Sequence, residues 1–479
     1  MKVLRYLLLM AVAAGCASPS DPEPFGPVPT PEQLAWHKSE MNMFAHFGPN
    51  TYSGLEWGQG TESNDLFAPD SLDCNQWAAV ARETGFGGII ITAKHHDGFS
   101  LWPNPSGTHS VAYSSWRDGK GDVLAELAQA CASAGIGFGV YLSPWDRNHP
   151  DYGTDAYNQA YAASLESVVS SYGPMFEVWF DGACGEGPTG RKQVYDWPLF
   201  MSKVREHQGN VVTFSNVGPG CRWVGNEEGR AGETNWATFT PEAHGAGRSD
   251  LPQDYGSYLA AGDEGGACWI PAEVDVSIRP GWFWRESEDS KVKTPEELYK
   301  IYLQSVGRGS VLLLNVPPTS HGLLHKNDVA SLKGFRALLD KAFADNLVRG
   351  ASSNGDFSSS HKASRAADGS FDTYWAAPAA KVSEPGRDVP ELTVELRDGV
   401  RGFDTIVLQE NIALGQRVAE FTVEADTPEG WKEITHGTTV GYKRILSVPK
   451  TEAGRIRVRF TRTLAAPVIS EVGVYLTEL

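Results

Sequence analysis

Residues 86–97 read FGGIIITAKHHD, an apolar run that ends in a group of polar side chains. The apolar part, 86–92, lacks the alternation of a strand that has one face in water. Continuous apolarity of this length is typical of a strand buried on both faces, as in a parallel sheet covered by helices. The stretch therefore predicts a buried parallel strand that carries Lys94, His95, His96 and Asp97 to one edge of its sheet.

Seven further runs repeat this pattern, and segments with helical signals separate them. Thr30, Pro31 and Gln33 have the arrangement of a helix start, with an N-cap, a proline in the first turn and a capping-box partner. Eight buried strands that alternate with helices over roughly 300 residues are the pattern of a TIM-like (β/α)8 barrel. We therefore expect an α/β fold with this barrel over residues 30–345. The other seven runs are 43–47, 136–142, 176–180, 211–214, 221–224, 272–278 and 311–314.

The pattern changes after Asn346. Short stretches with alternating apolar residues, 392–396, 421–425 and 456–460, are separated by turn signals and predict a C-terminal β-sandwich domain over residues 346–479. The segment 367–375 resembles discoidin or coagulation-factor-type C modules, many of which bind sugars. The resemblance implies a domain like a carbohydrate-binding module, and packing against the barrel is an equally good role.

The first residues have the features of an export signal. Lys2 and Arg5 precede the apolar run 7–14, which is too short to span a bilayer permanently. Small residues then lead to Cys16, as in a bacterial lipobox. We expect a lipoprotein signal peptide over 1–16 with lipidated Cys16 as the only membrane contact, and a tether over 17–29. The expected location is the bacterial periplasm or the outer-membrane surface. The alternative is an ordinary signal peptide with an incidental cysteine.

The composition restricts the partners. A formal net charge of −18 argues against nucleic acid or an anionic membrane surface. The cysteines other than Cys16 are widely spaced and form neither a disulfide framework nor a zinc pattern. Adjacent histidines such as His95 and His96 point to opposite faces of an extended chain and rarely bind one ion together. We therefore expect no metal and no cofactor, and we assign these histidines to hydrogen bonds with a ligand.

Two stretches carry carboxylates at the ends of predicted strands. The run 176–180 delivers Asp181 and Gly182, and the run 221–224 leads to Glu227 and Glu228 in a loop flanked by glycines. From its position alone, Asp181 is open to roles as nucleophile, metal ligand or turn cap. Glycoside hydrolysis uses one carboxylate to attack the sugar and a second carboxyl group to protonate the leaving oxygen. The two stretches therefore favour a glycosidase, and the lack of a GxSxG motif disfavours a serine esterase.

Five motifs, in this order, make the chain similar to a known family. FAHFG at 44–48, GLEWG at 54–58, KHHDGF at 94–99, YLSPW at 141–145 and VWFDG at 178–182 together resemble the α-L-fucosidases of glycoside hydrolase family 29. RWVGNE at 222–227 and EVDVSIRPGW at 273–282 look like the subfamily that acts on α1-3/4-linked fucose in branched glycans. A C-terminal β-sandwich is also usual in that subfamily.

The resemblance implies a retaining exo-α-L-fucosidase that releases terminal α1-3/4-linked fucose from Lewis-type oligosaccharides or glycoconjugates by double displacement. It implies Asp181 as the nucleophile and Glu227 as the acid/base, with Glu228 and Glu273 as alternatives for the second role. A surface glycan-binding lipoprotein without catalysis is the alternative from another class, which binding of fucose without its release would identify. The residues implied to form the fucose pocket are His46, Glu56, Trp57, His95, His96, Tyr141, Trp179, Arg222 and Trp282.

Overall fold

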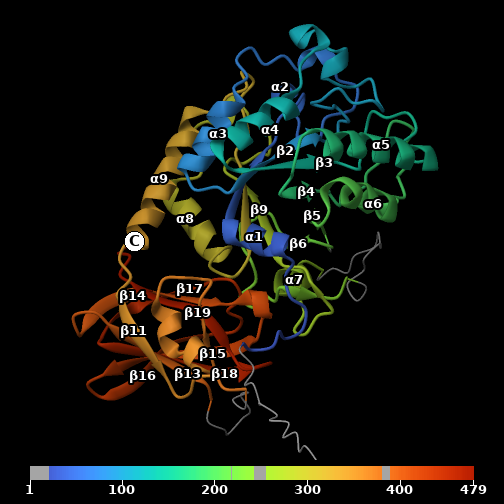
Figure 1. Cartoon of the computed structure of the whole chain (residues 1–479). Helices are drawn as coiled ribbons and strands as arrows, with labels where there is room; N and C mark the ends of the chain where they lie inside the picture. Colours follow the sequence, from blue (N-terminus) through green and yellow to red (C-terminus); the bar gives the residue numbers. More distant parts are fainter. Residues whose placement is uncertain (1–20, 217, 242–254, 380–388, 479) are drawn as a thin grey trace, which may run out of the picture.

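The computed structural model describes residues 21–216, 218–241, 255–379 and 389–478, which form a barrel and a β-rich domain beside it (Figure 1). Eight parallel strands close the barrel in the order β1-β10-β9-β6-β5-β4-β3-β2. Each strand lies on one of the eight predicted runs, so the predicted barrel is confirmed. The strands are β1 Met41–Ala45, β2 Gly88–Lys94, β3 Gly137–Leu142, β4 Glu177–Trp179, β5 Val212–Ser215, β6 Cys221–Trp223, β9 Ala272–Ser277 and β10 Val311–Asn315.

Helices cover the outside of the barrel (Figure 1). The predicted helix start at Thr30 is a capping box, in which the Thr30 hydroxyl and the Gln33 side chain each accept the other residue's N–H. One connection departs from the pattern, because β5 and β6 are joined by residues 216–220 alone, too few for a helix. The helices are α1 Pro31–Ser39, α2 Asn50–Ser53, α3 Cys74–Glu83, α4 Val123–Ala134, α5 Asp155–Ser171, α6 Trp197–Gln208, α7 Tyr255–Ala261, α8 Pro295–Gln304 and α9 Lys326–Ala342.

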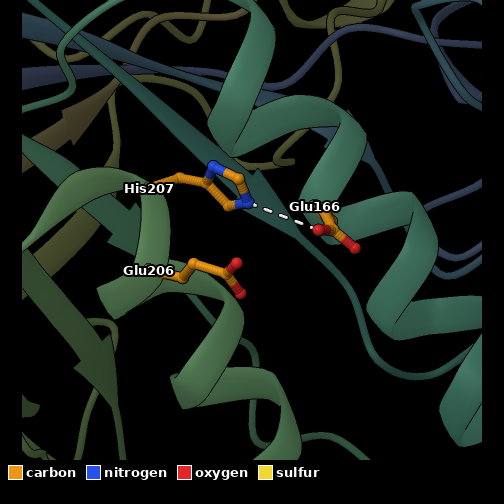
Figure 2. A group of neighbouring side chains, drawn as sticks. All are labelled: Glu166, Glu206 and His207. Carbon is orange, nitrogen blue, oxygen red and sulfur yellow. Dashed lines mark hydrogen bonds and ion pairs between the residues drawn. The ribbon is translucent and has the colours of Figure 1, made fainter.

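Charged side chains join α5 to α6 at the surface. Glu206 and His207 of α6 face Glu166 of α5 (Figure 2), and His207 Nε2 lies 3.4 Å from Glu166 Oε1. Lys203 Nζ lies 2.9 Å from the other carboxylate oxygen of Glu166. Solvent screens pairs of this kind, so they contribute little to the free energy of folding.

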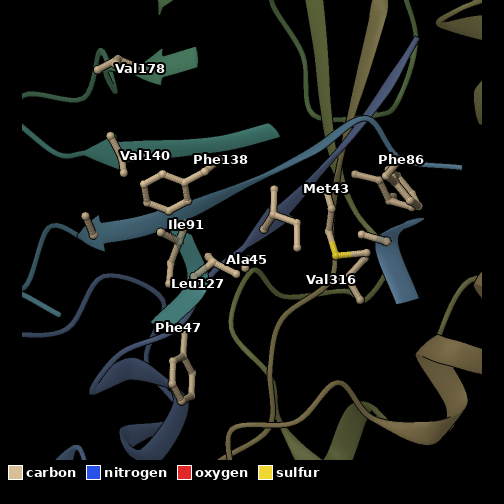
Figure 3. Close-up of a cluster of buried hydrophobic side chains, with 14 of the residues drawn as sticks. Met43, Ala45, Phe47, Phe86, Ile91, Leu127, Phe138, Val140, Val178 and Val316 are labelled. Atoms are coloured by element: carbon tan, nitrogen blue, oxygen red, sulfur yellow. The ribbon is translucent and has the colours of Figure 1, made fainter. Parts of the chain in front are cut away.

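The barrel strands contribute to two apolar layers. On β1, Met43 and Ala45 point outward into the layer between strands and helices (Figure 3), whereas Phe44 belongs to the layer inside the barrel. The outward layer continues through Ile91 of β2 and Val140 of β3. Because side chains of a strand alternate with a period of two, only every second residue of a strand reaches the barrel interior.

The C-terminal domain is the predicted β-sandwich. One sheet has the strand order β11-β13-β18-β15-β16 and the other β12-β19-β14-β17. Trp375, Val394, Val423, Phe460 and Val472 belong to the apolar core between them. The strands are β11 Val348–Ser353, β12 Trp375–Ala376, β13 Glu391–Leu396, β14 Arg401–Glu410, β15 Val418–Thr427, β16 Gly430–Gly437, β17 Arg444–Ala453, β18 Arg455–Thr463 and β19 Val468–Tyr475.

The sandwich packs against the end of the barrel where the strands begin. Glu40, directly before β1, accepts a hydrogen bond from the Tyr302 hydroxyl and pairs with Lys443 of the sandwich. Gln416 of the sandwich donates to the Asn235 carbonyl and accepts from the Ala237 N–H. The sandwich therefore has a packing role at the end of the barrel opposite to the carboxyl ends of the strands.

Part of the predicted tether is held on the sandwich. The Phe25 N–H donates to the Leu414 carbonyl at 3.0 Å, and Arg417 donates to the Glu23 carbonyl at 2.6 Å. Residues 23–25 therefore follow the surface of the C-terminal domain instead of extending away from it. The predicted signal peptide, Cys16 and the start of the tether lie outside the described residues. Within the described part of the chain, no helix is long and apolar enough to cross a membrane.

Candidate active site

A cavity of about 540 Å³ opens at the carboxyl ends of the barrel strands. Both predicted catalytic residues line it, and so does every predicted pocket residue except Arg222. The predicted residues that line it are Asp181, Glu227, His46, Glu56, Trp57, His95, His96, Tyr141, Trp179 and Trp282; the others are Phe44, Trp145, Gly182, Ala183, Cys184, Gly185, Phe214, Asn216, Trp223 and Asp275.

Asp181 follows β4 by two residues and points into the cavity. Its Oδ2 accepts a hydrogen bond from the Tyr141 hydroxyl at 3.0 Å, and its Oδ1 accepts the Ala183 N–H at 2.7 Å. His96 Nε2 lies 3.7 Å from Oδ2. These contacts hold the carboxylate in one orientation, and its side chain remains 26% exposed to the cavity. The Asp181 carboxylate is thus both fixed by hydrogen bonds and accessible from the cavity.

Glu227 lies across the same cavity, in the loop after β6. Its Oε2 accepts a hydrogen bond from the Trp282 indole at 3.3 Å. The Glu227 side chain is exposed to the cavity, yet partial burial of its carboxyl group raises its pKa, and the negative charges of Asp181 and Glu56 raise the pKa further. A carboxyl group in this environment keeps its proton to a higher pH and can deliver it to a leaving oxygen.

The two alternatives to Glu227 lie outside the cavity. Glu228 is exposed, and its carboxylate pairs with Arg230 at 2.7 Å. Glu273 is fully buried inside the barrel, where its Oε2 accepts the Trp179 indole N–H at 2.9 Å. Among the three glutamates that the sequence offers for the acid/base role, only Glu227 lines the cavity.

A further acidic residue of the cavity, Asp275, was not singled out from the sequence. It is 5% exposed, and its Oδ1 accepts the Trp223 indole N–H at 2.9 Å. Burial, followed by the charge of Glu227, raises the pKa of Asp275 to about 8. The signal was present in residues 273–277, where Glu, Asp and Ser alternate with valines: with a period of two, all three polar side chains face the barrel interior.

Burial favours the neutral form of the three histidines of the pocket. Burial lowers the pKa of His46 to about 3 and that of His96 to about 4, and it lowers the pKa of His95 well below the usual value. His46 Nδ1 lies 2.9 Å from Asn315 Oδ1, whose amide nitrogen donates elsewhere, so His46 donates there and its Nε2 can accept from a ligand hydroxyl. Neutral imidazoles can both donate to and accept from sugar hydroxyls.

The expectation that His95 and His96 point to opposite faces was wrong. Both rings line the cavity, with ring centroids 4.1 Å apart. The reason is that β2 ends at Lys94, so the pair lies in the turn after the strand and does not follow its alternation.

Aromatic rings form the floor and one wall. Trp179 stacks on Phe214 with centroids 3.8 Å apart and lies 5.3 Å from Tyr141 in a second stacked contact. Trp282 lies 5.0 Å from His46 at the side. Trp57 stands at the rim with 58% of its surface exposed. Such flat surfaces suit the C–H faces of a sugar ring.

Glu56 is held at the rim by contacts from the loop after β9. It pairs with the Arg285 guanidinium, and its Oε2 accepts the Trp282 backbone N–H at 3.1 Å. Its own carbonyl accepts from Asn50 Nδ2 at 3.3 Å. These contacts fix a carboxylate acceptor at the cavity edge, as binding of a sugar hydroxyl requires.

The predicted pocket role of Arg222 is not supported, because its side chain points out of the barrel. On β6 the neighbours Cys221 and Trp223 face inward, so Arg222 faces outward by the period of two. Its guanidinium is fully buried and donates to the carbonyls of Leu259 and Ile270, among other acceptors. Arg222 therefore fastens the segments behind β6, and Trp223 takes its place in the cavity wall.

Two groups of side chains in the described part of the chain bring metal-ligating atoms within 4.8 Å of one another. One is the surface group Glu166, Glu206 and His207 (Figure 2), where Lys203 already pairs with Glu166. The other is Glu177, Cys221 and Glu273 inside the barrel. Neither group lines the cavity, which instead holds two carboxyl groups in different environments: Asp181, which accepts two hydrogen bonds, and Glu227, whose pKa is raised.

Comparison with known proteins agrees with this geometry. The family profile described as "Alpha-L-fucosidase" matches residues 25–342. The α-L-fucosidase 1 of Arabidopsis thaliana is 40% identical over 464 residues, which cover 95% of this chain and 88% of the plant protein. A glycoside hydrolase 29 family member from a rumen bacterium is 36% identical with a TM-score of 0.82, covering 95% of this chain and 78% of its own. A Ruminococcus gnavus GH29 fucosidase solved in complex with fucose is 30% identical with a TM-score of 0.85, covering 95% and 96%. The chain therefore belongs to the α-L-fucosidases of glycoside hydrolase family 29.

Proposed function

We propose that this α-L-fucosidase releases terminal α1-3/4-linked fucose from branched glycans with retention of configuration, with Asp181 as nucleophile and Glu227 as acid/base. The observation that carries the proposal is that the two carboxyl groups line one cavity in different environments. Asp181 is held by Tyr141 and the Ala183 N–H, whereas the pKa of Glu227 is raised by burial and by nearby charge. Different environments for two carboxyl groups are the basis of their different roles in glycosidases.

In the first step, a carboxylate oxygen of Asp181 bonds to the anomeric carbon as the bond to the leaving oxygen breaks, and Glu227 gives its proton to that oxygen. The Asp181 carboxylate loses its charge when the ester forms. Because that charge helped to raise the pKa of Glu227, the pKa then falls and Glu227 becomes a better base. In the second step Glu227 takes a proton from water, the water oxygen bonds to the anomeric carbon, and Asp181 leaves as the carboxylate.

Fucose offers hydroxyl groups and one methyl group. His46, His95, His96 and Glu56 supply hydrogen-bond partners for the hydroxyls, and the ring of Trp282 supplies an apolar surface for the methyl face. The fucose complex of the R. gnavus relative supports fucose as the ligand. The preference for α1-3/4 linkages rests on the RWVGNE and EVDVSIRPGW stretches, and a cavity of about 540 Å³ has room for more than one monosaccharide.

We also propose export as a lipoprotein, on the basis of Lys2, Arg5, the apolar run 7–14 and Cys16. Cell fractionation of the full chain and of Cys16→Ser tests this. The wild type is expected in the membrane fraction and the variant in the soluble fraction, and equal solubility of the two would refute lipidation at Cys16.

The catalytic assignment is tested with Asp181→Asn and Asp181→Gly. The first is expected to remain folded without turnover, and azide is expected to restore turnover to the second. Full activity of Asp181→Asn would refute the assignment. Rates on Lewis-type oligosaccharides, α1-2-linked fucose and an aryl fucoside test the linkage, and equal rates on all three would refute the α1-3/4 preference. Calorimetric fucose binding by the wild type without fucose release would instead favour a glycan-binding protein.

A further inference from the structure

Three side chains meet inside the barrel, below the floor of the cavity. Glu177 comes from β4, Cys221 from β6 and Glu273 from β9, and all three are 0% exposed. One ligating atom of each lies within 4.8 Å of the others. Two carboxyl groups thus face each other in a space without contact with solvent.

Each carboxyl group accepts an indole N–H on its outer side. Trp36 of α1 donates to Glu177 Oε2 at 2.8 Å, and Trp179 donates to Glu273 Oε2 at 2.9 Å. The Cys221 thiol donates to Glu177 Oε1 at 3.6 Å. Glu273 Oε1 is buried and has no hydrogen-bond partner among the described residues. The inner side of the pair therefore lacks one donor.

Among the residues that the structure describes, no Lys, Arg or His side chain forms an ion pair with Glu177 or Glu273. Asp275, at the next inward position of β9, is itself acidic, and the Arg222 guanidinium beside Cys221 points out of the barrel. The inward residues Phe44 of β1 and Leu313 of β10 are apolar. Two ionised carboxylates this close and buried away from bulk solvent would repel each other strongly.

We propose that Glu177 and Glu273 share a proton and form a hydrogen-bonded carboxyl pair that holds Trp179 in place as the floor of the sugar pocket. The shared proton supplies the donor that Glu273 Oε1 lacks. Burial raises the pKa of both groups, that of Glu177 to about 7 and that of Glu273 well above its usual value, in agreement with the pair. Glu177 and Glu273 are thus positioning residues.

The carboxyl pair affects the active site through its contact with Trp179. This ring stacks on Phe214 and Tyr141, and the Tyr141 hydroxyl donates to Asp181. A displaced Trp179 would disturb both the floor of the pocket and the support of the nucleophile. This consequence rests on the proposed function of the cavity, whereas the shared proton does not.

The kinetic test compares Glu273→Gln with Glu273→Leu. Glutamine can accept the Trp179 N–H and donate to Glu177, as the protonated carboxyl does, so KM for an aryl fucoside is expected to stay within about twofold. Leucine leaves the buried indole without an acceptor, and KM is expected to rise about tenfold with a smaller change in kcat. Glu410→Gln in the sandwich, another buried carboxyl with a pKa raised to about 7, is the control and should leave KM unchanged. An equal loss in both Glu273 variants, or none in Glu273→Leu, would overturn the proposal.

The second test needs no activity, so it separates this proposal from the proposed function. A raised pKa means that the folded state binds the proton more tightly, and stability is lost as pH rises from about 4.5 to about 7. Tm of Glu177→Gln is therefore expected to fall less over this range than Tm of the wild type. An identical pH dependence would overturn the shared proton. A metal ion bound by Glu177, Cys221 and Glu273 is the alternative to a shared proton, and elemental analysis of the purified wild type tests for it. A stoichiometric metal that is present in the wild type and lost in Glu273→Gln would also overturn the proposal.

Discussion

Asp275→Asn is predicted to stabilise the protein at neutral pH. Asparagine has nearly the same size as aspartate, and its amide oxygen can still accept the Trp223 indole N–H that Asp275 Oδ1 accepts at 2.9 Å. What the substitution removes is an ionisable group that is 5% exposed and lies near Glu227. The wild type must either keep Asp275 protonated or bury a negative charge, and the variant need do neither.

The magnitude follows from the pKa of Asp275, which burial and the charge of Glu227 raise from 3.8 to about 8. Between these values the folded state binds a proton that the unfolded state has lost, so the stability of the wild type falls as pH rises. The difference is near zero at pH 4. At pH 7 it corresponds to on the order of 4 kcal/mol in favour of Asp275→Asn.

The assay is urea unfolding of the wild type and Asp275→Asn from pH 4.5 to pH 8, monitored by a spectroscopic signal that reports unfolding of the barrel. Glu228→Gln is the matched control, because Glu228 is an exposed carboxylate of the same region that pairs with Arg230. The control is expected to follow the wild type at every pH. If Asp275→Asn also follows the wild type, the account of a buried, proton-holding carboxyl in the pocket is wrong.

Three further changes separate the roles of pocket, rim and scaffold. Glu227→Gln is expected to lower kcat/KM on an oligosaccharide about 10²–10⁴-fold. The loss should be far smaller on an aryl fucoside with an activated leaving group, because that group leaves without a proton. Equal losses on both substrates would contradict the role of Glu227 as the acid. Trp57→Ala should raise KM about fivefold with little change in Tm, because the ring is 58% exposed and contributes a stacking surface; an unchanged KM would remove Trp57 from the binding site. Arg222→Lys is expected to lower the free energy of unfolding by about 2–4 kcal/mol, because lysine cannot replace the buried hydrogen bonds of the guanidinium group. KM of the folded variant is expected to stay near normal, and a large rise in KM would show that Arg222 contributes to the pocket.

The barrel could be predicted because burial on both faces leaves a local signal, a continuous apolar run, on each strand. The same rule concealed the polar residues that a strand sends inward. Asp275 lies between Val274 and Val276 of β9 and reaches the barrel interior by the period of two. Arg222 was misplaced because one step along β6 reverses the face. Strand register is set by pairing across the barrel, so it cannot be read from a short strand alone.

The roles of the carboxyl groups depended still more on distant residues. The sequence favoured Glu227 as the acid/base and left Glu228 and Glu273 as alternatives. In the structure the three differ in their partners, which are Trp282, Arg230 and Trp179, respectively. The contacts of Glu227 and Glu273 join segments that are far apart in the sequence, and the pairing of Glu228 with Arg230 lies in an exposed loop. The pKa of a carboxyl group is likewise set by burial and neighbouring charges that no local pattern contains.

The central claim is that Asp181 bonds to the sugar during turnover. Its most direct test is to inactivate the enzyme with a fluorinated fucosyl inhibitor, digest it and identify the modified peptide by mass spectrometry. The account predicts one fucosyl group per chain, on the peptide that contains Asp181, and no labelling of Asp181→Asn. A label on Glu227 or Asp275, or turnover of the inhibitor without any covalent intermediate, would contradict it.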